Sequence, residues 1–203
     1  EFCRLGIGRA CDLSTREKRT VIKNDFSKGP QGWSSYEYHA SMVAGQNIFI
    51  LATWEEDGGV DGGGYVWADQ ARWSCDAPEK PLSILPLIVH RSWTDEAPVD
   101  LRGGELSVYL RGDDLKLNGA QCYFWAHVGG TRWHCKGHPI GIGEGCWTDA
   151  PTRFPVVDDE ALWYMSWTKY PEPASLSEVL AGSHSYGFSF VGFGGEVTGR
   201  LAL

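Results

Sequence analysis

The stretch QCYFWAHVGGTRWHC, residues 121–135, consists of two runs of alternating side chains on either side of Gly129 and Gly130. A Gly-Gly pair tolerates the positive φ angles of a two-residue hairpin turn, so the pattern predicts an antiparallel hairpin. In the register set by that turn, Trp125 faces His134, His127 faces Arg132, and Tyr123 faces Lys136.

This hairpin has two unlike faces, because side chains alternate across a strand. One face carries Cys122, Phe124, Ala126, Val128, Trp133 and Cys135, which is the composition of a core. Cys122 and Cys135 are diagonal neighbours there, which leaves a disulfide between them open. The other face carries Tyr123, Trp125, His127, Arg132 and His134, and we expect it to point outward.

The rest of the chain repeats the strand pattern. Ten Trp, eight Tyr, eight Phe and 26 Gly in 203 residues favour strands and turns. Short apolar or alternating runs are predicted as strands at 37–44, 47–56, 63–69, 83–91, 104–112, 120–128, 131–137, 152–157, 186–193 and 197–203. One short helix is expected near 175–183, capped by Ser175 or Ser177, with Glu178 in its first turn. The pattern predicts an all-β antiparallel sandwich of jelly-roll type over residues 21–203, preceded by a basic arm over residues 1–20.

Charge and cysteine content limit the cellular compartment and the kinds of partner that we expect. The net charge of -8 disfavours binding to nucleic acid, and no apolar stretch reaches the length of about 20 residues that spans a membrane. The six cysteines are even in number and form no C-x-x-C pair, which disfavours a zinc ribbon. Either disulfides, including a local Cys3 to Cys11 bridge, or buried free thiols fit this count. We expect a secreted or extracellular protein; its oligomeric state is not indicated.

The run at 104–112 divides into two faces like the hairpin, with Leu106, Val108 and Leu110 inward and Tyr109 and Arg111 outward. If it pairs with 120–128, the outward faces merge into one surface of Tyr109, Arg111, Tyr123, Trp125, His127, Arg132 and His134. Aromatic rings stack on sugar rings, while Arg and His bind hydroxyls or acidic sugars. We therefore predict a face that binds an oligosaccharide or polysaccharide. Two alternatives are a face covered by a loop or by the arm, and a surface for a protein partner.

Three segments resemble galactose-binding-like β-sandwich modules, which include bacterial carbohydrate-binding modules and laminin type IV modules. They are DGGVDGGGYVWADQARWSCDAPE at 57–79, VDLRGGELSVYLRGDD at 99–114 and SYGFSFVGFGGEVTGRLAL at 185–203. The resemblance implies a jelly-roll sandwich with a lectin-like function. In such modules an acidic residue beyond the position of Leu203 helps to hold a structural calcium ion. This sequence stops at Leu203. We therefore expect that no cofactor is required. A structural calcium ion remains an alternative, for which the sequence contains no motif.

Catalysis on the same face is the alternative function, as a polysaccharide lyase or a glycoside hydrolase. A hydrolase needs two carboxylates across a cleft, but Glu55 and Glu56 are adjacent and point to opposite faces of a strand. Their loop, with Asp57 and Asp61, is better explained as solvated or as binding a cation. A lyase needs a base and a cation, which Tyr109, Tyr123, His127, Arg111 and Arg132 can supply. No catalytic residue is assigned.

A metal site is disfavoured, since His134 and Cys135 of the HCKGH motif at 134–138 point to opposite faces. A protein-binding matrix or assembly module is a third possible function.

Overall fold

The computed structural model describes residues 21–69 and 83–203, which form fourteen strands. The strands are β1 Trp33–Tyr36, β2 Phe49–Leu51, β3 Thr53–Glu55, β4 Tyr65–Asp69, β5 Ile84–His90, β6 Glu105–Val108, β7 Arg111–Lys116, β8 Gln121–Val128, β9 Thr131–Pro139, β10 Gly143–Glu144, β11 Thr152–Pro155, β12 Tyr164–Thr168, β13 Ser185–Val191 and β14 Thr198–Ala202. The helical elements are α1 Tyr38–Ala44, η1 Val60–Gly62, η3 Arg91–Thr94, η4 Glu160–Leu162 and α2 Leu176–Ala181.

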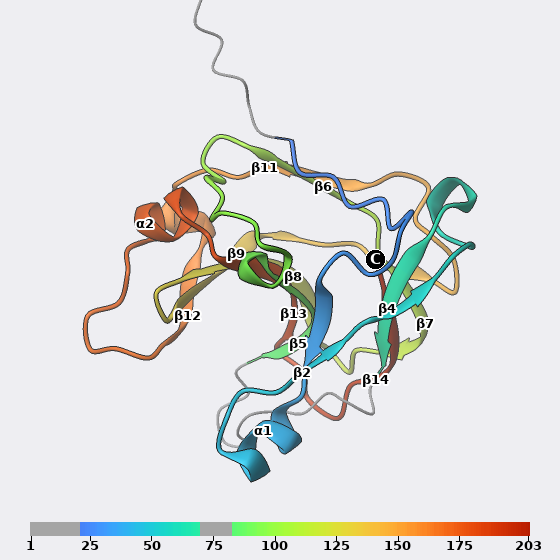
Figure 1. Cartoon of the computed structure of the whole chain (residues 1–203), viewed down its shortest axis with the longest axis horizontal. Coiled ribbons are helices and arrows are strands. Elements are labelled where there is room, and N and C mark those ends of the chain that lie inside the picture. Colours follow the sequence, from blue (N-terminus) through green and yellow to red (C-terminus); the bar gives the residue numbers. More distant parts are fainter. Residues whose placement is uncertain (1–20, 70–82) are drawn as a thin grey trace, which may run out of the picture.

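The strands form three sheets (Figure 1). The order in the seven-stranded sheet is β12-β9-β8-β13-β5-β1-β2, and in the five-stranded sheet it is β10-β7-β14-β4-β3. Strands β11 and β6 form a separate pair. Every pairing is antiparallel except that of β10 with β7. The predicted all-β, antiparallel fold is confirmed.

The core lies between the inner faces of the sheets. Phe124 and Phe188 of the seven-stranded sheet pack edge to face, with ring centroids 6.4 Å apart. Val66 and Leu201 of the five-stranded sheet are fully buried in the same cluster. Of the predicted core face of the 121–135 hairpin, Cys122, Phe124, Ala126 and Cys135 belong to this cluster, and Val128 and Trp133 pack against it. The neighbouring strands β13 and β5 approach closely at Gly187. A Cβ at this position would stand 2.3 Å from the Leu87 carbonyl oxygen, so only glycine fits there.

The hairpin turn and most of its register are confirmed. Gly129 and Gly130 have φ angles of 54° and 81°, which is the left-handed geometry of the predicted turn. Trp125 pairs with His134 and His127 pairs with Arg132. Tyr123 pairs with Pro139 and not with Lys136, because a register shift separates it from Trp125. Such a bulge changes the pairing that a strict two-residue period predicts.

The cysteines of the hairpin are free thiols. Cys122 and Cys135 are both buried, and no disulfide joins them; Cys146 is free and exposed. Burial raises the pKa of both core thiols, that of Cys135 to about 11. Of the two alternatives for the cysteines, disulfides or buried free thiols, the second therefore holds for Cys122 and Cys135. The Cys3 to Cys11 bridge and the basic arm lie outside the described residues, as does Cys75.

The predicted strand at 104–112 is two strands in different sheets. β6 pairs with β11, while β7 pairs with β14 on one side and β10 on the other. Both edges of β7 are therefore occupied, and the expected pairing of this run with 120–128 is wrong. The run at 47–56 also divides, into β2 and β3, at the buried residue Ala52.

Helix α1 replaces the strand predicted at 37–44. Ser41 explains part of the difference, because its hydroxyl donates to the Glu37 carbonyl and accepts from the Ile48 amide. The helix ends at Gly45, whose φ of 65° is left-handed. Helix α2 confirms the other prediction: Ser175 caps it, in a capping box with Glu178. Among the described residues, no helix is long and apolar enough to cross a membrane.

Candidate functional site

Four rings form a row across the outer face of the seven-stranded sheet. Trp93 of η3 lies 4.9 Å from His90 of β5, measured between ring centroids. His90 lies 6.3 Å from His127 of β8, and His127 lies 6.2 Å from Trp167 of β12. Strand pairing places them on one face, since Ser185 pairs with both histidines and Arg132 pairs with both His127 and Trp167. We call Trp93, His90, His127 and Trp167 the ring row.

The two ends of the ring row are open to solvent and its middle is fixed. Trp93 is 44% exposed and Trp167 is 40% exposed. Phe49 of β2 packs against Trp93 at 4.9 Å and against His90 at 6.4 Å. His127 Nδ1 lies 3.0 Å from the Ser185 hydroxyl oxygen. These contacts set the ring orientations before any ligand arrives.

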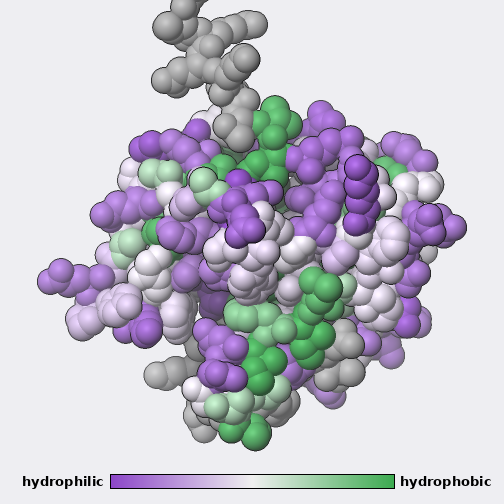
Figure 2. Space-filling model, viewed as in Figure 1, coloured by the Kyte–Doolittle hydropathy of each residue, from purple (hydrophilic) through white to green (hydrophobic). Residues whose placement is uncertain are grey.

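The apolar surface continues from the ring row onto β2. Figure 2 shows apolar side chains gathered at the bottom of this view, over α1 and β2. Exposed Leu51 belongs to this surface and lies two residues from Phe49, on the same strand face. The ring row is therefore part of a wider accessible face and not an isolated pair of tryptophans.

The imidazoles of the ring row are neutral at neutral pH. Burial lowers the pKa of His127 to about 4, and the neighbouring His90 and Arg132 lower it further. Burial also lowers the pKa of His90, with a contribution from His184. A neutral imidazole offers one nitrogen as donor and the other as acceptor. Arg91, next to His90 in the chain, is paired with Glu96 at 2.9 Å.

Three residues of the predicted face are buried, so the expectation that they are exposed is wrong. Trp125, Arg132 and His134 are 1%, 9% and 0% exposed. The Arg132 guanidinium lies over the Trp125 ring at 5.8 Å and donates to the hydroxyls of Ser166 and Ser83 at 3.1 and 3.2 Å. This part of the sheet matches the covered-face alternative.

The His134 side chain is buried and forms no hydrogen bond with another described residue. Its ring stacks on Tyr164 of β12 at 5.3 Å, and both ring nitrogens and the Tyr164 hydroxyl lack partners among the described residues. Burial, followed by the charge of Arg132, holds the pKa of His134 well below its usual value. Tyr123 is half-buried, and its hydroxyl donates to Gln121 on the same strand.

Tyr109 and Arg111 lie away from the hairpin face. The run 104–112 that contains them divides into β6 and β7, and neither of these strands pairs with β8. The Arg111 guanidinium lies between the rings of Tyr65 and Trp147, at 4.6 and 4.9 Å, and pairs with Asp113 at 3.0 Å. Its charge is therefore already engaged. The merged surface of seven residues is not formed, and His127 is the predicted residue that lies in the ring row.

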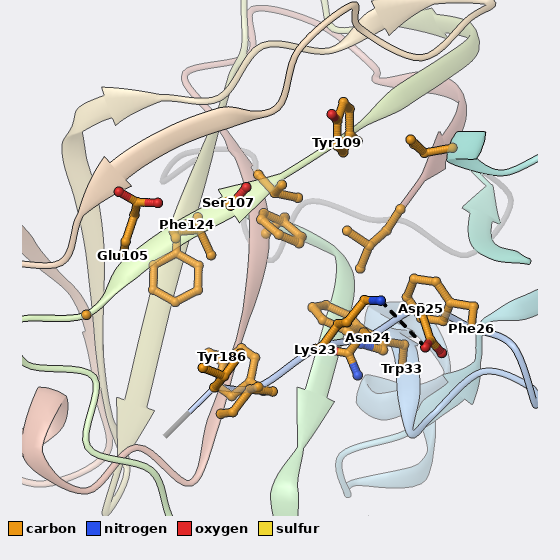
Figure 3. A pocket seen from close by; sticks show the side chains of 18 of the residues that line it. Lys23, Asn24, Asp25, Phe26, Trp33, Glu105, Ser107, Tyr109, Phe124 and Tyr186 are labelled. Atoms are coloured by element: carbon orange, nitrogen blue, oxygen red, sulfur yellow. Dashed lines mark ion pairs between the residues drawn. The ribbon is translucent and has the colours of Figure 1, made fainter. Parts of the chain in front are cut away.

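A cavity of about 580 Å³ lies on the inner side of the same sheet, between residues 21–26 and β6 (Figure 3). Its floor is aromatic: Trp33, Phe124, Tyr186 and Phe188. Figure 3 shows Glu105 and Ser107 on β6 at one side, and Lys23, Asn24 and Asp25 at the other. Sequence patterns did not indicate this cavity, because its floor belongs to core positions.

No grouping of three or more metal-ligating side chains occurs in residues 21–69 and 83–203. No family model, curated protein or solved structure matches the chain. The likeness to galactose-binding-like modules therefore stays a resemblance of sequence segments. The class that the structure defines is an all-β sandwich with an aromatic and histidine-lined outer face.

Proposed function

We propose that the protein is a glycan-binding module and that the ring row is its binding surface. The observation that carries the proposal is a pair of exposed tryptophans joined by two neutral imidazoles on one sheet face. Indole faces stack on the C–H faces of sugar rings. A chain of sugars lying along the row places one ring on Trp93 and another on Trp167, with hydroxyls between them over His90 and His127.

The electrostatics of the row favour neutral sugars. The imidazoles carry no charge at neutral pH and pair with hydroxyls, which both donate and accept. The nearby cations are engaged, Arg91 by Glu96 and Arg132 by Ser166 and Ser83. The net charge of -8 also repels polyanions. We therefore expect a neutral polysaccharide to bind more tightly than a polyuronate.

Preorganisation supports the same proposal. Phe49 holds Trp93 and Ser185 holds His127, so little side-chain entropy is lost when a ligand binds. In this arrangement the buried residues Arg132 and Trp125, on the same sheet face, are positioning residues and do not contact the sugar. An extracellular glycan is the corresponding partner, and no cofactor takes part.

The test is affinity electrophoresis in soluble neutral polysaccharides and in two polyuronates, pectate and alginate. Trp93→Ala and Trp167→Ala should each weaken binding by about tenfold or more, because each removes a stacking ring. The melting temperature should change little, since both side chains are partly exposed. Tyr170→Ala is the matched control, because Tyr170 is an exposed aromatic residue near Trp167 but outside the row.

Two further readouts separate the alternatives. New reducing ends, or the absorbance of an unsaturated uronic product, would identify a hydrolase or a lyase acting on this face. Absence of binding to every polysaccharide, or equal binding by the alanine variants and wild type, would overturn the glycan proposal. The first of these results leaves a protein partner as the function of the exposed rings.

A further inference from the structure

The turn between β7 and β8 contains an Asn-Gly pair, Asn118 and Gly119. The φ angles of these residues are 48° and 94°, and the Ala120 amide donates to the Leu117 carbonyl oxygen at 3.0 Å. This is a two-residue turn with two left-handed residues, for which Asn-Gly is a favoured sequence. Both residues are exposed. The chain contains three asparagines, and Asn118 is the one that precedes a glycine.

This turn joins the two large sheets. β7 belongs to the five-stranded sheet and β8 to the seven-stranded sheet. The chain crosses between the same sheets a second time after β13, before β14 begins at Thr198. Asn118 links the two crossings, because its carbonyl oxygen accepts from the Gly194 amide at 2.8 Å and its side-chain amide donates to the Glu196 carbonyl oxygen. Asn118 therefore holds one corner of the sandwich together.

The Asn118 side chain is next to a backbone nitrogen that can react with it. The Gly119 N–H forms no hydrogen bond within the described part of the chain, and glycine has no Cβ that would crowd the nitrogen. Asparagine is among the thermally labile residues. In the described residues, one hydrogen bond holds the Asn118 side-chain amide, and its acceptor is the Glu196 carbonyl oxygen. Opening of that single bond releases the side chain without unfolding either sheet.

We infer that Asn118 is a site of spontaneous covalent modification, at which water replaces the side-chain ammonia through a cyclic imide. The Gly119 nitrogen bonds to Asn118 Cγ as the bond from Cγ to Nδ2 breaks, and the Gly119 amide proton leaves with the ammonia. Water then adds to either carbonyl carbon of the imide ring. Cleavage of one C–N bond gives aspartate, and cleavage of the other gives isoaspartate. The reaction needs no enzyme, metal or oxidant.

Either product weakens the corner between the two crossings. Aspartate and isoaspartate carry a carboxylate, which cannot donate to the Glu196 carbonyl oxygen as the Asn118 amide does. Isoaspartate also adds an atom to the backbone of a turn that two residues close. Loss of one hydrogen bond of this kind should lower the melting temperature by about 2–4 °C in a chain of this size. The ring row is separate from this turn, because His127 lies near the other end of β8.

Peptide mass spectrometry of the wild-type protein, after incubation at pH 8 in native buffer, tests the inference. The tryptic peptide 117–132 should gain the mass that conversion of an amide to an acid adds. The peptides that contain Asn24 and Asn47 should remain unconverted over the same time. Both of these asparagines are exposed, but Asp25 and Ile48 follow them, and a side chain at that position hinders the backbone nitrogen.

Two variants measure the structural consequence. Asn118→Asp creates one of the products directly and should melt about 2–4 °C below the wild type. Asn47→Asp is the matched control, because it makes the same change of charge at an exposed asparagine. The Asn47 side-chain oxygen accepts from the Tyr36 hydroxyl, and an aspartate oxygen also accepts, so this variant should melt close to the wild type.

The inference is overturned if the peptide 117–132 is converted no faster than the peptides that contain Asn24 and Asn47. The role of Asn118 at the corner is overturned if Asn118→Asp and Asn47→Asp melt at the same temperature. Because the mass measurement uses the wild-type protein, its result does not depend on how well either variant folds.

Discussion

Acidification from pH 7 to pH 5 should destabilise the protein through its histidines. The pKa of His127 is about 4 in the folded state, against about 6.5 in an unfolded chain. Between these values the unfolded chain binds a proton that the folded chain does not, so stability present above pH 6.5 is lost as the pH falls towards 4. The pKa values of His90 and His134 are lowered in the same direction.

The loss of unfolding free energy caused by His127 alone follows from the difference between its folded and unfolded pKa values. One lowered histidine costs about 1.4 kcal/mol per pH unit, from the unfolded pKa down to the folded one. From pH 7 to pH 5 this amounts to about 2 kcal/mol, and partial solvent exposure reduces it to about 1–2 kcal/mol. The pKa values of Asp25, Asp100 and Glu178 are lowered from already acidic values, so these three carboxylates titrate below this window.

Urea unfolding at pH 7, 6 and 5 measures the effect. Wild type should lose about 1–2 kcal/mol more than His127→Asn between pH 7 and pH 5, because the amide cannot bind the proton. Gln46→Ala, an exposed change without an ionisable group, should keep the wild-type slope. The reasoning is refuted if His127→Asn and wild type lose equal stability over this range.

Two further outcomes follow from burial in the hairpin. His134→Phe should raise the free energy of unfolding by about 1 kcal/mol, because it removes two buried nitrogens that have no partner among the described residues and keeps a ring against β12; a loss measured in the same urea assay would contradict this. Cys146 should react with a thiol reagent in the folded protein, while Cys122 and Cys135 react only after unfolding. Peptide mass spectrometry distinguishes the three, and rapid labelling of Cys122 in native buffer would contradict the structure.

Local chemistry made the hairpin and helix α2 predictable. The turn needs positive φ angles at two successive residues, and Gly129 and Gly130 satisfy that need within the turn itself. The cap of α2 is likewise formed by Ser175 and Glu178, three residues apart. In both cases the deciding interactions involve neighbours in the chain, so their pattern is visible without the fold.

Pairing between distant strands was not predictable in the same way. Residues 104–112 have the alternation of one strand, but β14 and β10 occupy the edges of β7. Which edge is free depends on the whole topology, and this moved Tyr109 and Arg111 away from the hairpin. The helix at 38–44 also depends on a contact outside the helix, because the Ser41 hydroxyl accepts a hydrogen bond from the Ile48 amide.

Alternation identifies the residues that share a face, but it does not identify what packs on that face. Trp125 and His127 are both on the outer face of β8, as predicted, yet Trp125 is 1% exposed. Replacing Trp125 with alanine therefore removes buried area, and its cost should be that of a core substitution, about 3–5 kcal/mol. The predicted face is confirmed for Trp125 and His127, but the exposed tryptophans on that side of the sheet are Trp167 and Trp93.

A buried residue of this face, Arg132, affects the protonation state of His127 in the ring row. Arg132 lies over Trp125, is held by Ser166, and pairs across the strands with both His127 and Trp167. Its charge adds to burial in keeping the His127 imidazole neutral. A neutral imidazole is what a sugar hydroxyl needs as donor and acceptor, whereas an imidazolium only donates. The charge of buried Arg132, whose backbone lies between those of His127 and Trp167, therefore acts in the same direction as burial on the protonation state of the proposed glycan surface.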